Sequence, residues 1–193
     1  YLEEVKEFYT RNNYNYSWFS KQHAADLVLL AGYIDNSDIL GLRKDDYHPA
    51  LFKTYMALQP PGDSLSAELQ FTDAAIHWLH DILMGNATPA LGYNGFTYEP
   101  ACHDLPLLLN TYLNSGRFSM LLTEQESKLT EYLAVKSKLV AFQKTVSING
   151  FKDAVVPASK RGITNKPLLT RLYQLGILTS DTITLTEKML ASK

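Results

Sequence analysis

The sequence predicts a mainly α-helical protein, an irregular multi-helix domain followed by a short helical C-terminal appendage. Apolar residues recur at helical spacing in successive segments, which capping and turn residues separate. Strand alternation of the kind that builds a parallel sheet is absent from the pattern. With 193 residues and 46% hydrophobic content, the chain can also support a sizeable core.

The first two helices are expected on either side of an Asn-rich stretch. Apolar residues from Leu2 to Tyr9 follow helical spacing, and this helix should end near Arg11, before Asn12, Asn13 and Asn15. Ser20 is expected to cap the second helix. The inward stripe of that helix is predicted to be His23, Leu27, Leu30, Ala31 and Ile34, with a turn at Gly41.

Two further helices flank a proline-rich break. Pro is well tolerated at a first helical position, so a short helix is expected over Pro49 to Leu58, ended by Pro60, Pro61 and Gly62. Asp63 or Ser64 should cap the next, which is predicted to end at Gly85 as its C′ residue. Its expected inward stripe is Leu65, Leu69, Thr72, Ile76, Leu79 and Leu83.

After a long loop over Asn86 to Pro100, two more helices are expected. Asp104 should cap one that runs through Leu113 and is closed by Asn114, Ser115 and Gly116. Thr123 and Glu126 are interpreted as the capping box of the other, which would reach about Val146. Its shared face would be Leu129, Leu133, Lys136, Leu139 and Val140.

A domain boundary is expected in the mixed stretch from Ser147 to Arg161. The sequence therefore predicts a helical domain over 1–150 and, over 151–193, a linker with truncated helices. One of these helices is expected between Asn165 and Gly176, and another from about Thr184 onward.

Composition argues against several function classes. A formal charge of −2 with mixed signs provides no electrostatic footprint for nucleic acid. No apolar run approaches the roughly 20 residues that span a bilayer, so no membrane span is expected. The one cysteine, Cys102, rules out an internal disulfide framework and lacks metal-site spacing, and neither a metal nor a cofactor is expected.

Two side-chain groupings could carry chemistry. Asp73, His77, His80 and Asp81 share a helix face and could present metal ligands, but the two histidines lack the spacing of a zincin. Imidazoles bonded to their neighbours are the favoured interpretation. Cys102 beside His103 could be a reactive thiol, yet the side chains of adjacent residues diverge, so a structural or incidental cysteine is favoured and no catalytic residue is assigned.

Aromatic residues are dense in two places. They are Phe8, Tyr9, Tyr14, Tyr16, Trp18 and Phe19 near the start, and Tyr93, Phe96 and Tyr98 in the long loop. Aromatic rings bind sugars in water, and they also fill cores and anchor loops. A core or anchoring role is favoured for most of them.

Several motifs together resemble the N-terminal scaffold region of the large bacterial L,D-transpeptidases, which cross-link peptidoglycan. They are Phe-Tyr-Thr-Arg-Asn-Asn-Tyr-Asn-Tyr-Ser-Trp over 8–18, Gly41-Leu42 followed by Asp-Asp-Tyr-His over 45–48, and Leu-Gln-Phe-Thr-Asp over 69–73 followed by Gly85 and Pro89. The family's usual Pro near the Trp is Tyr16 or Ser17 here, and Lys44 stands where another Pro is common. The resemblance covers roughly Val5 to Val146, and Lys166 to Leu178 looks like the start of a peptidoglycan-binding module.

The resemblance implies a non-catalytic scaffold that positions a catalytic domain on the cell wall. The family's catalytic motifs, His-x-x-Gly and Ser-x-Gly-Cys-x-Arg, do not occur in this sequence, so the nucleophile cannot be assigned to Cys102. Expected partners are peptidoglycan and the catalytic domain, in the periplasm or cell envelope. Sugar contact is expected at Tyr93, Phe96 and Tyr98. The alternatives are a helical protein-interaction module and, less favoured, a metal-dependent hydrolase using Asp73, His77 and His80.

Overall fold

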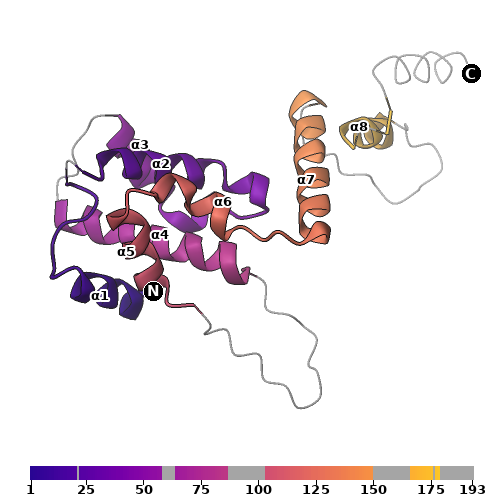
Figure 1. The fold of residues 1–193 in the computed structure, drawn as a ribbon. Helices are drawn as coiled ribbons and strands as arrows, with labels where there is room; N and C mark the ends of the chain where they lie inside the picture. The colour runs from indigo at the N-terminus through magenta and orange to yellow at the C-terminus, as the bar shows by residue number, and fades with distance from the viewer. Residues whose placement is uncertain (21, 58–63, 87–102, 150–165, 176, 179–193) are drawn as a thin grey trace, which may run out of the picture. The chain divides into compact units, whose positions relative to one another are not determined.

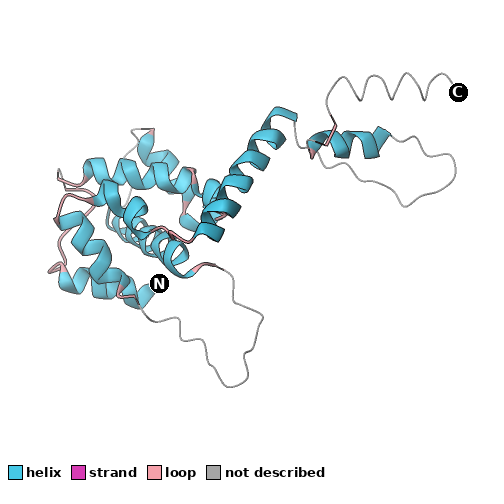
Figure 2. Ribbon diagram, turned by 45° about the vertical axis from the view of Figure 1, so that its right-hand side comes forward, coloured by secondary structure: helices cyan, strands magenta, loops and turns pink. Residues whose placement is uncertain are grey.

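The computed structural model describes residues 1–193 except 21, 58–63, 87–102, 150–165, 176 and 179–193. Helices form all the regular structure of this described part, which contains no strand (Figures 1 and 2). The predicted mainly α-helical class is therefore confirmed.

The described helices divide between two compact units, Tyr1–Tyr132 and Leu133–Lys193. The first unit holds α1 (Leu2–Arg11), α2 (Ala24–Asp35), α3 (Pro49–Met56), α4 (Ser64–Met84), α5 (Leu105–Asn114) and α6 (Leu121–Gln125), with short 3-10 helices η1 (Ser37–Leu40), η2 (Lys44–Tyr47) and η3 (Phe118–Met120). The helix α7 (Thr130–Asn149) begins in the first unit and continues into the second, which also holds α8 (Lys166–Gln174). Of the mixed stretch expected over Ser147 to Arg161, residues 147–149 belong to α7, and the rest lies outside the described residues.

The core of the first unit is built around α4. The helices α1 and α5 pack against α4 and against each other, and η2 packs against α4, whereas α2 packs against α3 and η3. Large side chains fill the space between them, with Tyr33 stacked on Trp78 and Trp18 edge-on to Phe118. The largest fully buried residues are Trp18, Trp78, Tyr47, Phe8, Phe71 and Phe118.

Several predicted helix ends are confirmed. The Asp104 side chain accepts the Leu107 backbone N–H at 3.0 Å, which makes it the N-cap of α5. Gly85 and Gly116 lie directly after α4 and in the turn after α5, with φ of +77° and +66°. In this left-handed region a side chain would be strained, which explains glycine at both positions.

The predicted capping box at Thr123 and Glu126 is wrong. Thr123 lies inside α6, and the chain turns extended at Glu126 before α7 begins at Thr130. Leu121 is buried, and the helical turn that begins with it lies earlier in the chain than the helix start that the sequence pattern suggested. The Lys128 ammonium donates to the Thr123 carbonyl, so the end of α6 is capped where a helix start was expected.

The start of α2 also differs from the prediction. Its N-cap is His23, and Ser20 instead sits one turn earlier, where its hydroxyl accepts the His23 N–H at 3.2 Å. The short helices η1 and η2 were not predicted. A single 3-10 turn is too brief to show a hydrophobic period.

The inward stripe predicted for α4 is only partly correct. Thr72, Ile76 and Leu79 are buried, whereas Leu65 and Leu69 are 55% and 40% exposed. Glu68 is instead almost completely buried. The N-terminal part of α4 therefore turns a different face inward from the one that hydrophobicity alone indicates.

On α7, no described side chain from Thr130 to Thr145 is fully buried. Leu129 and Leu133 of the predicted face are exposed, and Lys136, Leu139 and Val140 are half-buried. In the second unit, Leu169 and Gln174 of α8 are buried. Among the described helices, none has the length and apolar character that a bilayer crossing requires.

Candidate functional site

The site begins with an acidic residue buried on α4. The Glu68 carboxylate accepts the backbone N–H groups of Ser17, Trp18 and Phe19, and the hydroxyl of Tyr9 donates to it at 3.0 Å. A carboxylate that accepts several N–H bonds is stabilised despite its burial. Glu68 therefore fixes the segment that follows α1 onto the start of α4.

One turn later, Thr72 extends this network. Its hydroxyl accepts the indole N–H of Trp18 at 2.9 Å and lies 2.7 Å from the hydroxyl of Tyr9. Burial raises the pKa of Tyr9 well above its ordinary value; the bond with Thr72 partly offsets this, and the carboxylate of Glu68 adds to it. The phenol of Tyr9 thus stays neutral and serves as a structural hydrogen-bonding group that joins α1 to α4.

The turn between α1 and Trp18 has an unusual backbone. Asn13 and Tyr14 have φ of +50° and +57°, in the left-handed region. Asn tolerates this region, but a bulky residue such as tyrosine rarely adopts it. Two side-chain hydrogen bonds stabilise the turn. The Asn12 amide donates to Ser17 Oγ at 2.9 Å, and the Asn15 amide donates to the Asn12 carbonyl at 3.0 Å.

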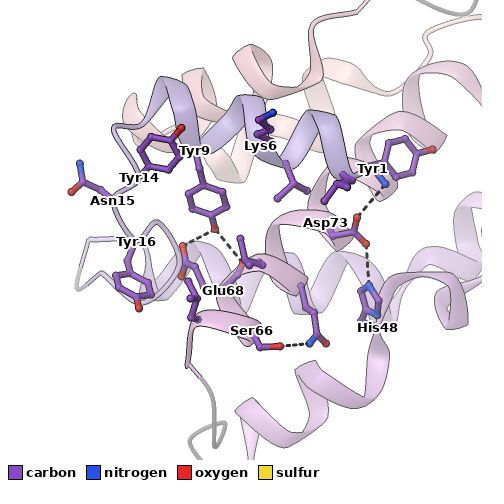
Figure 3. A pocket seen from close by; sticks show the side chains of 15 residues that line it. Tyr1, Lys6, Tyr9, Tyr14, Asn15, Tyr16, His48, Ser66, Glu68 and Asp73 are labelled. Atoms are coloured by element: carbon purple, nitrogen blue, oxygen red, sulfur yellow. Dashed lines mark hydrogen bonds and ion pairs between the residues drawn. The ribbon is translucent and has the colours of Figure 1, made fainter.

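Between α1 and α4, next to this turn, lies a groove of about 710 Å³ (Figure 3). Figure 3 shows Tyr14, Asn15 and Tyr16 at one end, with Asp73, His48 and Tyr1 at the other. The side chains that line the groove are Tyr1, Leu2, Val5, Lys6, Tyr9, Tyr14, Asn15, Tyr16, His48, Leu65, Ser66, Glu68, Leu69, Gln70 and Asp73. This volume is in the range of small-molecule sites.

The second end of the groove also contains a strained residue. His48 has φ of +50°, and its Nε2 lies 3.0 Å from Asp73 Oδ2. In the described part, Asn13, Tyr14 and His48 are the non-glycine residues at positive φ, and the latter two line the groove. Because backbone strain tends to persist at functional sites, its presence at both ends marks the groove as the candidate site.

The hypothesis of a metal site at Asp73, His77, His80 and Asp81 gains no support. Asp73 pairs with His48, while His80 Nδ1 and His77 Nε2 lie 3.0 and 3.6 Å from Asp81, which also accepts the Tyr47 hydroxyl at 2.7 Å. Among the described residues, no group of three or more His, Cys, Asp or Glu side chains could hold a metal ion. The favoured interpretation, imidazoles bonded to neighbours, describes this cluster.

The residues predicted to contact sugar lie outside the described part of the chain. Tyr93, Phe96 and Tyr98 belong to 87–102, as does Cys102. The aromatic cluster near the start divides into buried Phe8, Tyr9 and Trp18 and exposed Tyr14 and Tyr16. The two exposed tyrosines were not predicted as site residues, although their position in an Asn-rich stretch that breaks a helix was a signal for a shaped turn.

Comparison with known proteins identifies the family. A family model described as Scaffold domain matches residues 3–139. The chain belongs to the Scaffold domain family. No curated protein and no solved structure matches it significantly.

The match gives this groove a place within the family's region. In this Scaffold domain, the matched residues run from α1 through α6 into α7 and include nearly all of the groove. The groove is therefore a feature of the scaffold itself rather than of α8 or the residues after it.

Proposed function

We propose that this chain is the non-catalytic scaffold portion of a peptidoglycan L,D-transpeptidase. The observation that carries the proposal is the match of the Scaffold domain over residues 3–139. This is the same stretch, roughly Val5 to Val146, in which the motifs resemble that enzyme family. The partners would be the enzyme's catalytic domain and peptidoglycan, in the periplasm or cell envelope.

The interactions of the motif residues are consistent with a scaffold role. Tyr9 and Trp18 bond to Glu68 or Thr72 on α4, and Tyr47 donates to the buried carboxylate of Asp81. Such bonds rigidify the domain rather than create a reactive group. A rigid flanking domain raises the effective concentration of a tethered catalytic unit at a polymeric substrate and restricts its geometry.

The first test is to read the native coding sequence on both sides of the chain. The proposal expects His-x-x-Gly and Ser-x-Gly-Cys-x-Arg downstream of Lys193, and a secretion signal upstream of Tyr1. A stop codon soon after Lys193 would contradict it.

The second test measures positioning directly. Full-length enzyme and a variant without residues 3–139 would be compared on intact cell-wall sacculi and on soluble muropeptides, with product cross-links quantified by chromatography. A positioning role predicts a larger loss on sacculi than on soluble fragments, because only the polymer needs to be oriented. Equal losses on both substrates would refute positioning, and a variant lacking the catalytic thiol is the negative control.

A second candidate function, a helical protein-interaction module, is favoured by the surface of α7. Apolar residues are exposed on and beside this helix, at Leu129, Leu133, Val135 and Phe142. Val135 and Phe142, seven residues apart, share one face of the helix, and an exposed apolar face commonly marks a protein contact. This alternative predicts that Val135→Asp abolishes binding to the partner protein, while Lys144→Asp, on the opposite face of the same helix, leaves it intact.

A further inference from the structure

The groove between α1 and α4 offers two tyrosine rings to solvent at one end. Tyr14 is 73% exposed and Tyr16 is 51% exposed, whereas Tyr9 is buried and its hydroxyl bonds to residues of α4. Sugar rings in water stack their C–H faces on such aromatic faces. The strained φ of Tyr14 keeps one ring at the groove, although an asparagine or glycine would suit that backbone better.

The floor of the groove is aliphatic, and its leucine side chains are also exposed to solvent. Leu2, Leu65 and Leu69 line it and remain 79%, 55% and 40% exposed. Two of these leucines had been expected to face the core. An acetamido methyl group of an N-acetylated sugar is small and apolar, so it could cover leucine surface while its neighbouring ring stacks on tyrosine.

Polar groups border this apolar floor. Asn15 and Gln70 line the groove and carry side-chain amides, which can both donate to and accept from sugar hydroxyls. Gln70 is held in place by its bond to Ser66 Oγ at 2.9 Å. Lys6 contributes an ammonium on the α1 side, where a carboxylate of the glycan or its attached peptide would be favourably placed.

We propose that this groove binds a short strand of N-acetylated amino sugars, with rings over Tyr14 and Tyr16 and acetyl methyls against Leu65 and Leu69. The inference rests on the proposed function, because it names the part of the scaffold that would contact the cell-wall polymer. It names a sugar contact separate from the loop aromatics, Tyr93, Phe96 and Tyr98, which stay a prediction.

The experiment is a titration of the full chain with a soluble tetramer of N-acetylglucosamine, followed by NMR chemical shifts and calorimetry. The test variants are Tyr14→Asn and Tyr16→Ala. Asn suits positive φ, so Tyr14→Asn should melt no lower than the native chain. Each variant is expected to weaken binding about tenfold, the loss of one stacked ring.

The matched control is the triple variant Tyr93→Ala/Phe96→Ala/Tyr98→Ala, which is expected to bind the tetramer as the native chain does. Loss of binding in this control, with binding retained in Tyr14→Asn, would overturn the inference. So would the absence of saturable binding up to about 10 mM tetramer, well above ordinary site affinities.

The outcomes separate this inference from the proposed function. If the coding sequence holds the catalytic motifs but the tetramer does not bind, the scaffold assignment stands and the groove inference fails. If the tetramer binds through Tyr14 and Tyr16 but no catalytic domain is encoded, the groove inference stands and the scaffold assignment fails.

Discussion

The carboxylate of Glu68 accepts the backbone N–H of Trp18 at 3.1 and 3.2 Å, across 50 residues of sequence. The bond joins the end of the turn after α1 to the first turns of α4, and Glu68 is only 1% exposed. Ser17 and Phe19, on either side of Trp18 in the sequence, donate their backbone N–H groups to the same carboxylate. One side chain thus positions the segment that shapes the groove.

Glu68→Gln should destabilise the first unit by about 2–3 kcal/mol, because an amide offers one oxygen and turns an N–H toward backbone donors. Chemical denaturation measures the difference. Glu7→Gln is the control, since Glu7 pairs with Arg11 on the surface and should change stability by less than about 1 kcal/mol. Equal effects of the two substitutions would refute the structural role of Glu68.

Thr72→Val should cost about 2 kcal/mol, because the shape is kept while the indole N–H of Trp18 loses its acceptor. Thr72→Ser keeps the hydroxyl and removes only a methyl group, with an expected cost of about 1 kcal/mol. Thermal melting of both variants checks the order. A Ser variant less stable than the Val variant would show that the hydroxyl is unimportant.

Stability should fall at alkaline pH because of Tyr47. Burial, and then its bond to Asp81, raises the pKa of Tyr47 above the ordinary 10.0, so the folded state favours the neutral phenol. This contribution is fully present below about pH 10 and is lost as pH rises toward the folded-state pKa. The free energy of unfolding, measured from about pH 8 to pH 11, should fall less steeply in Tyr47→Phe. Identical slopes would contradict the role of Tyr47.

Asp104→Ala should destabilise the first unit by about 1 kcal/mol through loss of the α5 cap. The Leu107 N–H, and then Arg11, lowers the pKa of Asp104, so its contribution is present above the ordinary 3.8 and is lost as pH falls further. Asp104→Ser keeps a capping oxygen and removes only the contact with Arg11, so the loss should be smaller. Denaturation at neutral and acidic pH distinguishes the two variants.

Tyr14→Gly should leave stability unchanged or raise it by up to about 1 kcal/mol, because glycine adopts positive φ without a steric penalty. Tyr16→Gly should instead lower stability. Tyr16 is not at positive φ, so glycine relieves no strain there and only increases the conformational entropy of the unfolded chain. Melting temperatures of the two variants decide the matter. Destabilisation by Tyr14→Gly would mean that its ring, rather than its backbone, governs the turn.

Much of the fold follows from local sequence. The Asp104 cap and the Gly85 helix end were predictable because each depends on the residue's own chemistry and on neighbours within one turn. The capping box at Thr123 failed because burial of Leu121 and the bond from Lys128 decided where α6 lies. Tertiary contacts there outweighed the local sequence pattern.

The sequence by itself determined the helical class, most helix positions and the region that belongs to the Scaffold domain family. Only the tertiary structure decided that Glu68 faces inward while Leu65 and Leu69 line a groove with Tyr14 and Tyr16. The reason is physical. Helix periodicity reports only average hydrophobicity, whereas a buried carboxylate is tolerated when distant backbone N–H groups meet it, and that meeting exists only after the chain has folded.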